Sequence, residues 1–242
     1  TKLPGTAAAT REARVLNDPA RQRDIPVELY LPANGGQCDA GHRCPVALLS
    51  PGYGMAHTDY GFIADALAGA GYLVVAVQHD LPGDVAPPDG ADLVAARTPM
   101  WQRGAENLRF VRATLAGEYP AFDWDHLALV GHSNGGDISA LAVKESPGFA
   151  SALVTLDNRR YPLPRDPAIR VLSLRGADFQ ADPGVLPAAG EGAICVQPIP
   201  GARHNDMNDR GPGWLKARIA ALVVDFLRNG RCGNDAGAAA AG

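Results

Sequence analysis

The segment that decides the fold of this chain is LALVGHSNGG, residues 127–136. An apolar run typical of a buried strand leads into Gly-x-Ser-x-Gly, and the residues after it, DISALAV (137–143), have the pattern of a helix. A serine on so sharp a turn needs small neighbours, which Gly131 and Gly135 supply. A bare Gly-x-Ser-x-Gly also suits an ordinary glycine turn, but this strand-to-helix context predicts that Ser133 is an exposed nucleophile.

The composition limits the classes of protein to which this chain can belong. The 242 residues are 46% hydrophobic with a net charge of -4, and the positive charges form no block, so we expect no nucleic-acid partner. No stretch approaches the roughly 18 uninterrupted apolar residues of a membrane span. We expect one domain over residues 1–230, followed by a Gly/Ala-rich, disordered tail at 231–242.

The four cysteines lie in a polar loop, Cys38 and Cys44, and near the end of the chain, Cys195 and Cys232. A free thiol is usually buried, so these positions favour two disulfides, Cys38–Cys44 and Cys195–Cys232, and an oxidising compartment. We therefore expect a secreted or periplasmic protein. A metal site on Cys38, His42 and Cys44 is the alternative, but this spacing matches no common zinc motif.

Strand and helix patterns alternate after residue 45, as in a mostly parallel sheet with helices on both faces. Before that, residues 14–16 and 25–31 flank a turn and predict an antiparallel hairpin. The further expected strands are 46–50, 73–77, 127–130, 152–156, 170–174 and 194–199, and the further expected helices are 59–71, 100–117 and 214–227. Residues 80–100 hold four prolines and four aspartates, which predicts an irregular loop over a site.

A nucleophilic serine needs an imidazole to take its proton and a carboxylate to orient that imidazole. His204 is the best candidate base, because it follows the last strand in a turn-rich segment. The other histidines precede the serine; His57, His79 and His132 lie near strand ends, whereas His42 and His126 are expected on surface loops. Three aspartates suit the chain order Ser, Asp, His: Asp157 at the end of one strand, and Asp178 and Asp182 after the next.

An oxyanion hole needs two backbone N–H groups close to the serine. One is expected from Asn134, directly after Ser133. The other is expected from Tyr53 in the loop SPGYG, residues 50–54, where the flanking glycines let the backbone approach a tetrahedral intermediate. A plain Pro-Gly turn is the alternative for this loop.

Over residues 45–205 the chain resembles the α/β-hydrolases, and more narrowly esterases of the platelet-activating-factor acetylhydrolase type. PGYG (51–54) stands where that family has its His-Gly-Leu-Gly oxyanion loop, and GHSNGG (131–136) matches its elbow closely. TLDNRRYPL (155–163) is similar to the family's segment with the catalytic acid, which favours Asp157. In cutinase-like and dienelactone-hydrolase-like relatives the acid follows the next strand, so Asp178 and Asp182 stay open. Pro51 departs from the family and is similar to the Pro-Gly-Tyr loop of cutinase-like polyester hydrolases.

The resemblance implies an α/β-hydrolase fold and a serine carboxylic-ester hydrolase that needs no cofactor or metal. Its substrate would be a small-molecule or lipid ester, short-chain or phospholipid-like. A cutinase-like polyester hydrolase and a catalytically silent binding protein of the same fold are the alternatives. Arg159, Arg160 and Arg165 suit a rim for an anionic substrate, but a solvated surface loop explains them as well.

Overall fold

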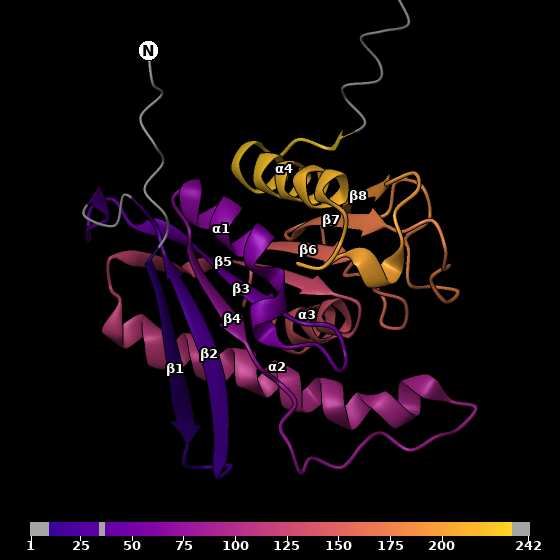
Figure 1. The fold of residues 1–242 in the computed structure, drawn as a ribbon, viewed down its shortest axis with the longest axis horizontal. Helices are drawn as coiled ribbons and strands as arrows, with labels where there is room; N and C mark the ends of the chain where they lie inside the picture. The colour runs from indigo at the N-terminus through magenta and orange to yellow at the C-terminus, as the bar shows by residue number, and fades with distance from the viewer. Residues whose placement is uncertain (1–9, 34–36, 234–242) are drawn as a thin grey trace, which may run out of the picture.

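The computed structural model describes residues 10–33 and 37–233, which form one eight-stranded sheet flanked by helices (Figure 1). The strands are β1 (Thr10–Asp18), β2 (Arg23–Leu31), β3 (Cys44–Ser50), β4 (Leu73–Val77), β5 (Phe122–His132), β6 (Ala152–Leu156), β7 (Arg170–Arg175) and β8 (Ala193–Pro198). The helices are α1 (Gly61–Gly69), α2 (Leu93–Glu118), α3 (Asn134–Glu145) and α4 (Gly213–Asn229), with short 3-10 helices η2 (His57–Tyr60) and η3 (His204–Asp206).

The sheet order is β1-β2-β4-β3-β5-β6-β7-β8. β1 and β2 pair antiparallel, as do β2 and β4, and every other neighbouring pair is parallel. The predicted sheet with its N-terminal antiparallel hairpin is therefore confirmed. β5 begins at Phe122 rather than at 127, because Phe122 and Asp123 already pair with the start of β3.

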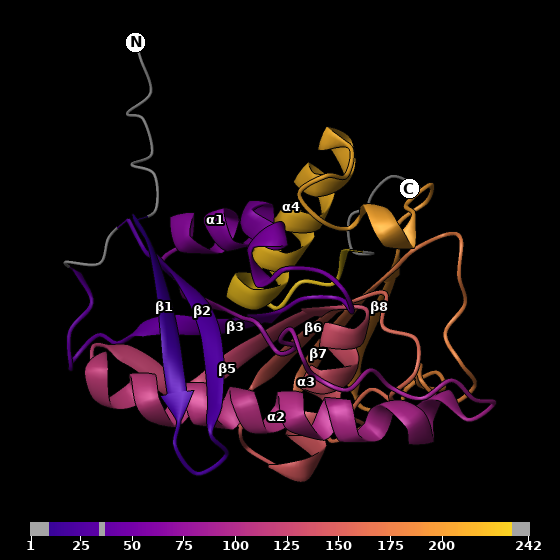
Figure 2. The same ribbon diagram turned by 60° about the horizontal axis from the view of Figure 1, so that its bottom comes forward.

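The helices cover both faces of the sheet, as expected. α1 and α4 lie on one face, and α2 and α3 lie on the other (Figure 2). Successive side chains of a strand point to opposite faces, so Val46 and Leu48 pack in the core beneath α2 and α3 while Ala47 and Leu49 pack in the core beneath α1 and α4. Burial on both faces explains why the central strands read as continuous apolar runs.

α2 begins seven residues before the expected start at Met100 and contains Pro99. The Asp92 side chain caps it by accepting a hydrogen bond of 3.0 Å from the backbone N–H of Ala95. Residues 93–99 are partly or fully exposed, so water can solvate the carbonyl that Pro99 leaves without a donor. The expected loop at 80–100 is therefore wrong from residue 93 on.

Both predicted disulfides, Cys38–Cys44 and Cys195–Cys232, are present. The first removes the two thiolates that the alternative metal site would have needed. The second joins β8 to the segment after α4. Of the expected tail, residues 234–242 lie outside the described residues, and a single domain over 1–230 stays a prediction.

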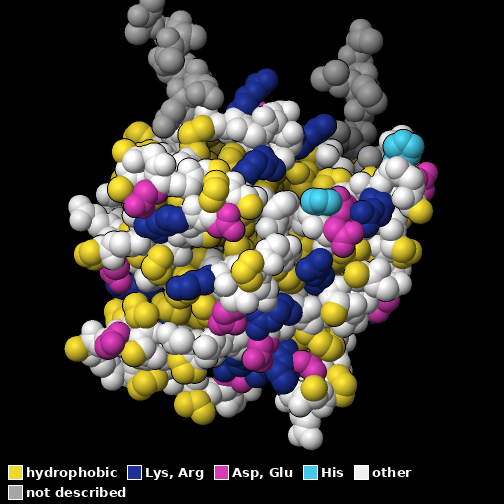
Figure 3. Space-filling model, turned by 180° about the vertical axis from the view of Figure 1, so that it is seen from behind, with side chains coloured by type: hydrophobic (Ala, Val, Ile, Leu, Met, Phe, Trp, Pro, Cys, Tyr) yellow, Lys and Arg dark blue, Asp and Glu magenta, His cyan; other side chains and the backbone are white. Residues whose placement is uncertain are grey.

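Acidic and basic side chains are interspersed on the face opposite to that of Figure 1 (Figure 3). Among residues 10–33 and 37–233, no helix is both long enough and apolar enough to span a bilayer.

Candidate functional site

The turn between β5 and α3 is as tight as the sequence predicts. Ser133 has φ 52° and ψ -116°, a backbone conformation that is strained for a residue with a side chain. A Cβ atom at Gly131 would collide with the backbone carbonyl of Gly135, and one at Gly135 would collide with the carbonyl of Ser50. The glycines are therefore required because β5, β3 and the start of α3 touch backbone to backbone.

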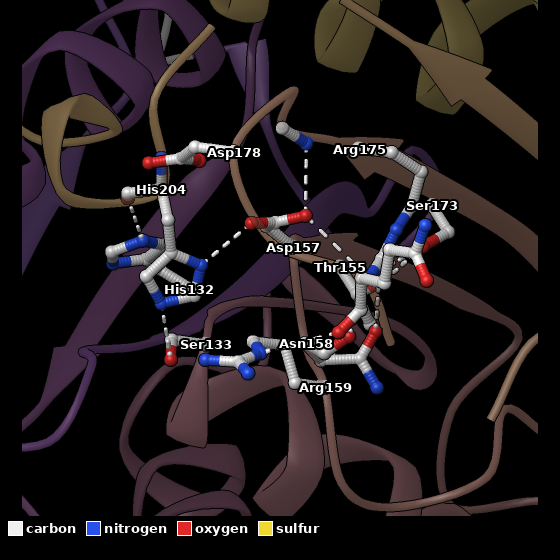
Figure 4. A network of polar contacts seen from close by, with 12 residues as sticks. His132, Ser133, Thr155, Asp157, Asn158, Arg159, Ser173, Arg175, Asp178 and His204 are labelled. Atoms are coloured by element: carbon white, nitrogen blue, oxygen red, sulfur yellow. Dashed lines mark hydrogen bonds and ion pairs between the residues drawn. The ribbon is translucent and has the colours of Figure 1, made fainter. Parts of the chain in front are cut away.

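Ser133, His204 and Asp157 form one hydrogen-bonded chain (Figure 4). Ser133 Oγ lies 2.9 Å from His204 Nε2, and His204 Nδ1 lies 2.6 Å from Asp157 Oδ2. The carboxylate can only accept, so Nδ1 carries a proton and Nε2 is left to accept the hydroxyl proton of Ser133. The arrangement is able to deprotonate the serine.

Asp157 follows β6 and is fully buried, with φ 55°. Its Oδ1 accepts a hydrogen bond of 2.8 Å from the backbone N–H of Gly176 and lies 3.5 Å from Arg175 Nη2. Burial raises the pKa of Asp157, but the hydrogen bonds from His204 and Gly176 and the charge of Arg175 outweigh it, so the pKa lies below its ordinary value. The carboxylate is thus ionised when His204 needs a partner.

Arg175 is a buried supporting group that the sequence analysis missed. Its guanidinium donates to the Asn158 carbonyl at 2.8 Å and to Ser173 Oγ at 3.1 Å, which fixes its position behind Asp157 (Figure 4). Burial lowers its pKa, although Asp157 opposes this. An arginine at the carboxyl end of the mostly buried strand β7 is the sequence signal that could have identified it.

The other two candidate acids lie elsewhere in the site. Asp178 accepts a hydrogen bond of 2.9 Å from the backbone N–H of His204, and Asp182 pairs with Arg160 at 2.7 Å. Of the three candidates, Asp157 is the one that contacts the imidazole of His204. Asp178 instead positions the His204 backbone.

The two expected oxyanion donors flank the serine. Asn134 is the first residue of α3, and Tyr53 lines the same pocket as Ser133. Within the described ranges, neither backbone N–H has a hydrogen-bond acceptor, so both are available to a ligand. The Asn134 side chain is held by the buried Trp101, whose Nε1–H donates to Asn134 Oδ1 at 2.7 Å. Trp101 is therefore a core residue that also orients the start of α3.

His132 links the loop after β3 to the loop of His204. Its Nε2 lies 2.9 Å from the carbonyl oxygen of His204, and its Nδ1 lies 2.7 Å from the Tyr60 hydroxyl, which accepts from the Gly52 N–H at 2.9 Å. Burial, and then the neighbouring His204, lowers the pKa of His132 to about 4. A neutral ring that donates to His204 and accepts from Tyr60 satisfies every one of these contacts.

A second Ser–His pair lies beneath the site. Ser50 Oγ is 2.9 Å from His79 Nε2, and Asn107 Nδ2 is 3.2 Å from His79 Nδ1. All three residues are buried, and burial lowers the pKa of His79 to about 3. Because no substrate can reach this group, it anchors the end of β3 and does no chemistry.

The serine opens into a half-open pocket of about 440 Å³. Its lining residues are Gly52, Tyr53, Met55, Arg97, His132, Ser133, Asp137, Arg159, Arg160, Phe179, His204, Asn205, Asn208 and Arg210. An apolar pocket of the same volume beside α3, lined by Val143, Tyr161 and Ile169 among others, holds none of the predicted catalytic and oxyanion residues. Ser133, His204 and Tyr53 all line the first pocket.

The expected arginine rim is only partly present. Arg159 and Arg160 line the pocket of Ser133, but Arg165 does not. Arg165 donates instead to the backbone carbonyls of residues 163, 184, 185 and 186, so its role is structural. Arg97, Arg210 and Phe179 line the pocket without having been predicted.

No protein-family model and no curated protein sequence matches the chain. Solved structures do match in fold. A ferulic acid esterase from Streptomyces cinnamoneus has 19% identity and a TM-score of 0.65 over 91% of this chain and 89% of its own. Esterase 2 of Thermogutta terrifontis has 16% identity and a TM-score of 0.66, over 93% of this chain and 95% of its own. A dienelactone hydrolase from Anabaena variabilis has 15% identity and a TM-score of 0.61, over 91% of this chain and 98% of its own. The chain thus has the α/β-hydrolase fold.

Asp137 gives a pH-dependent prediction for stability. It is buried in the first turn of α3, and burial raises its pKa to about 6, while N–H donors of Tyr161, Arg160 and Asn158 oppose the shift. A carboxyl whose folded pKa is raised destabilises the fold when ionised. We expect Asp137→Asn, which keeps the acceptor oxygen, to raise the free energy of unfolding at pH 7.5 by on the order of 2 kcal/mol. The gain should vanish as the pH falls from 6 to 4.

Urea unfolding of both proteins at pH 7.5, 5 and 4 measures this gain. A stability difference that does not change with pH would contradict the raised pKa of Asp137.

Proposed function

We propose that this protein is a serine hydrolase that cleaves carboxylic-ester bonds. Ser133 is the nucleophile, His204 the general base and acid, and Asp157 the group that orients His204. The observation that carries the proposal is the continuous chain of hydrogen bonds, 2.9 Å and 2.6 Å long, that joins the three side chains at the floor of an open pocket.

In the first half-reaction, Ser133 Oγ attacks the ester carbonyl carbon while its proton passes to His204 Nε2. The carbonyl oxygen becomes an oxyanion that accepts from the N–H groups of Tyr53 and Asn134, and the N-terminus of α3 adds a favourable field. When the intermediate collapses, the C–O bond to the alcohol breaks, the alcohol takes the proton from His204, and an acyl-serine remains.

In the second half-reaction, a water molecule takes the place of the alcohol. His204 removes its proton, the water oxygen attacks the acyl carbon, and collapse returns the proton to Ser133 Oγ as the carboxylic acid leaves. Asp157 stays ionised throughout and stabilises the imidazolium that forms in each half. Because the Nδ1–H of His204 is already hydrogen-bonded to Asp157 in the free protein, little free energy is spent on rearranging these groups when the reaction begins.

The similar solved structures support this chemistry. They include proteins described as esterases, and Esterase 2 of Thermogutta terrifontis is recorded both phosphorylated by paraoxon and with butyrate bound. Organophosphorus esters modify activated serines. The pocket of about 440 Å³ suits a small, short-chain ester, which is the substrate size we propose.

We also propose that the protein works in an oxidising compartment, secreted or periplasmic. Two disulfides at sequence separations of 6 and 37 support this, since reducing compartments keep thiols free. A peptide map of the natively produced protein under non-reducing conditions should show both cross-linked pairs. Four free thiols in that map would overturn the assignment of the compartment.

The nucleophile is tested by intact mass after exposure to a fluorophosphonate. We expect one adduct on the wild type and none on Ser133→Ala, because the probe needs a serine activated by a base. Esters of short acids should be hydrolysed by the first protein only. Folded wild type that gains no adduct would favour the silent binding protein instead.

The acid is tested by a matched pair of isosteric changes. Asp157→Asn should lower kcat by about 1,000-fold or more, because an amide that donates to Nδ1 favours the wrong tautomer of His204. Asp178→Asn keeps an oxygen for the His204 N–H and should cost about tenfold or less. Steady-state kinetics with one short-chain ester measures both. Similar losses in the two variants would contradict the role of Asp157.

A further inference from the structure

We propose that the pocket selects esters that carry a second, negatively charged group, a carboxylate or a phosphate, close to the scissile bond. This inference rests on the proposed function and names its substrate class. It follows from the charges that line the pocket and from the partners that those charges have.

The lining is strongly biased towards positive charge. It contains four guanidinium groups, on Arg97, Arg159, Arg160 and Arg210, against the single carboxylate of Asp137. Oδ1 of Asp137 already accepts hydrogen bonds from the Tyr161 N–H at 2.9 Å and from Asn158 Nδ2 at 3.3 Å. The carboxylate of Asp137 thus offsets only part of the positive charge that lines the pocket.

Two of the four arginines already have carboxylate partners. Arg160 pairs with Asp182 at 2.7 Å, and Arg210 lies 3.4 Å from Asp59. Arg97 and Arg159 pair with no carboxylate among the residues that the structure describes. Arg159 Nε donates to the backbone carbonyl of Gln180 at 3.4 Å. The Nη groups of Arg159 and the guanidinium of Arg97 are therefore available for the hydrogen bonds with which guanidinium groups bind carboxylates and phosphates.

The two available arginines are held in place by aromatic rings. Cζ of Arg159 lies 4.5 Å from the centroid of the Phe179 ring, and Cζ of Arg97 lies 5.4 Å from the centroid of Tyr53. Both rings are about half exposed, at 43% and 48%, so they form part of the wall of the pocket. Stacking on a ring orients a guanidinium while its N–H edge stays free for a ligand.

These pairs stand close to the reacting groups. Phe179 contacts the His204 ring edge-on, with 5.6 Å between centroids, and Tyr53 carries the proposed oxyanion N–H. In Figure 4 the Arg159 guanidinium points toward Ser133. An ester bound at Ser133 would thus bring an attached anionic group within the reach of Arg159, of Arg97, or of both.

The experiment compares single-ester substrates that are isosteric and differ in charge. Monomethyl glutarate against methyl glutaramate places the charge on the acyl side, and 4-acetoxybutanoate against 4-acetoxybutanamide places it on the alcohol side. A further substrate, 2-acetoxyethyl phosphate, tests phosphate against carboxylate. The measured quantity is the ratio of kcat/KM for the anionic ester to that for its neutral partner.

For wild type we expect this ratio to exceed ten on at least one side. Arg159→Gln or Arg97→Gln should lower the preferred ratio about tenfold, and Arg159→Lys should restore part of it, because the point charge is kept without the bidentate geometry. Arg218→Gln is the matched control, since it removes one positive charge from an exposed position on α4 outside the pocket. It should leave both kcat/KM values unchanged.

Ratios near one for every pair, with Ser133 still labelled by the fluorophosphonate, would overturn the anion selectivity and leave the esterase proposal standing. If no ester is hydrolysed, binding decides. Calorimetric titration of Ser133→Ala with monomethyl glutarate should show tighter binding than with methyl glutaramate, and the double variant Ser133→Ala/Arg159→Gln should lose this difference. Equal binding of the two ligands would overturn the inference by itself.

Discussion

The contact on which the rest of the site depends is the backbone packing between the ends of β3 and β5 and the start of α3. Without side chains at Gly131 and Gly135, the carbonyl of Ser50 approaches the first turn of α3 directly. This close approach goes with the strained, positive-φ backbone of Ser133, which holds its side chain at the sharp turn between β5 and α3. It also sets the free N–H of Asn134 beside the loop that carries Tyr53. One steric requirement thus places both the proposed nucleophile and the proposed oxyanion donors.

The loop that carries His204 is held in position by hydrogen bonds to loops that lie far apart from it in the sequence. His132 joins the Tyr60 hydroxyl to the carbonyl of His204, and Asp178 receives the N–H of the same histidine. His204 is therefore fixed through its backbone on two sides before its imidazole meets Asp157. A proposed base that is fixed in this way loses little conformational entropy when a substrate binds.

The sheet, the hairpin, the elbow and the disulfide pairs could be predicted because their signals are local: short apolar runs bounded by turn residues, small residues at fixed spacing, and cysteines in polar loops. The choice among Asp157, Asp178 and Asp182 was open from the residues alone, because three loop carboxylates differ only in tertiary placement. The position of Arg97 on a helix could not be predicted from the sequence. Pro99 favours a loop at residues 80–100, whereas in the structure the cap at Asp92 starts the helix at Leu93. Tyr60 acts through hydrogen bonds to Gly52 and His132 in other segments, which no window of sequence reveals. The sequence signals Arg175 only as an arginine at the end of a strand, and its place behind Asp157 is set by tertiary structure.

The Cys195–Cys232 bridge has a consequence for how the site is assembled. His204 lies inside the covalent ring that this bridge closes, whereas Ser133 and Asp157 lie outside it. Oxidation therefore restricts the segment that bears the imidazole even in the unfolded chain, and it leaves the serine and its elbow to be shaped by the sheet alone. The redox state of the chain thus bears directly on the segment that carries one member of the proposed triad and not on the segments of the other two.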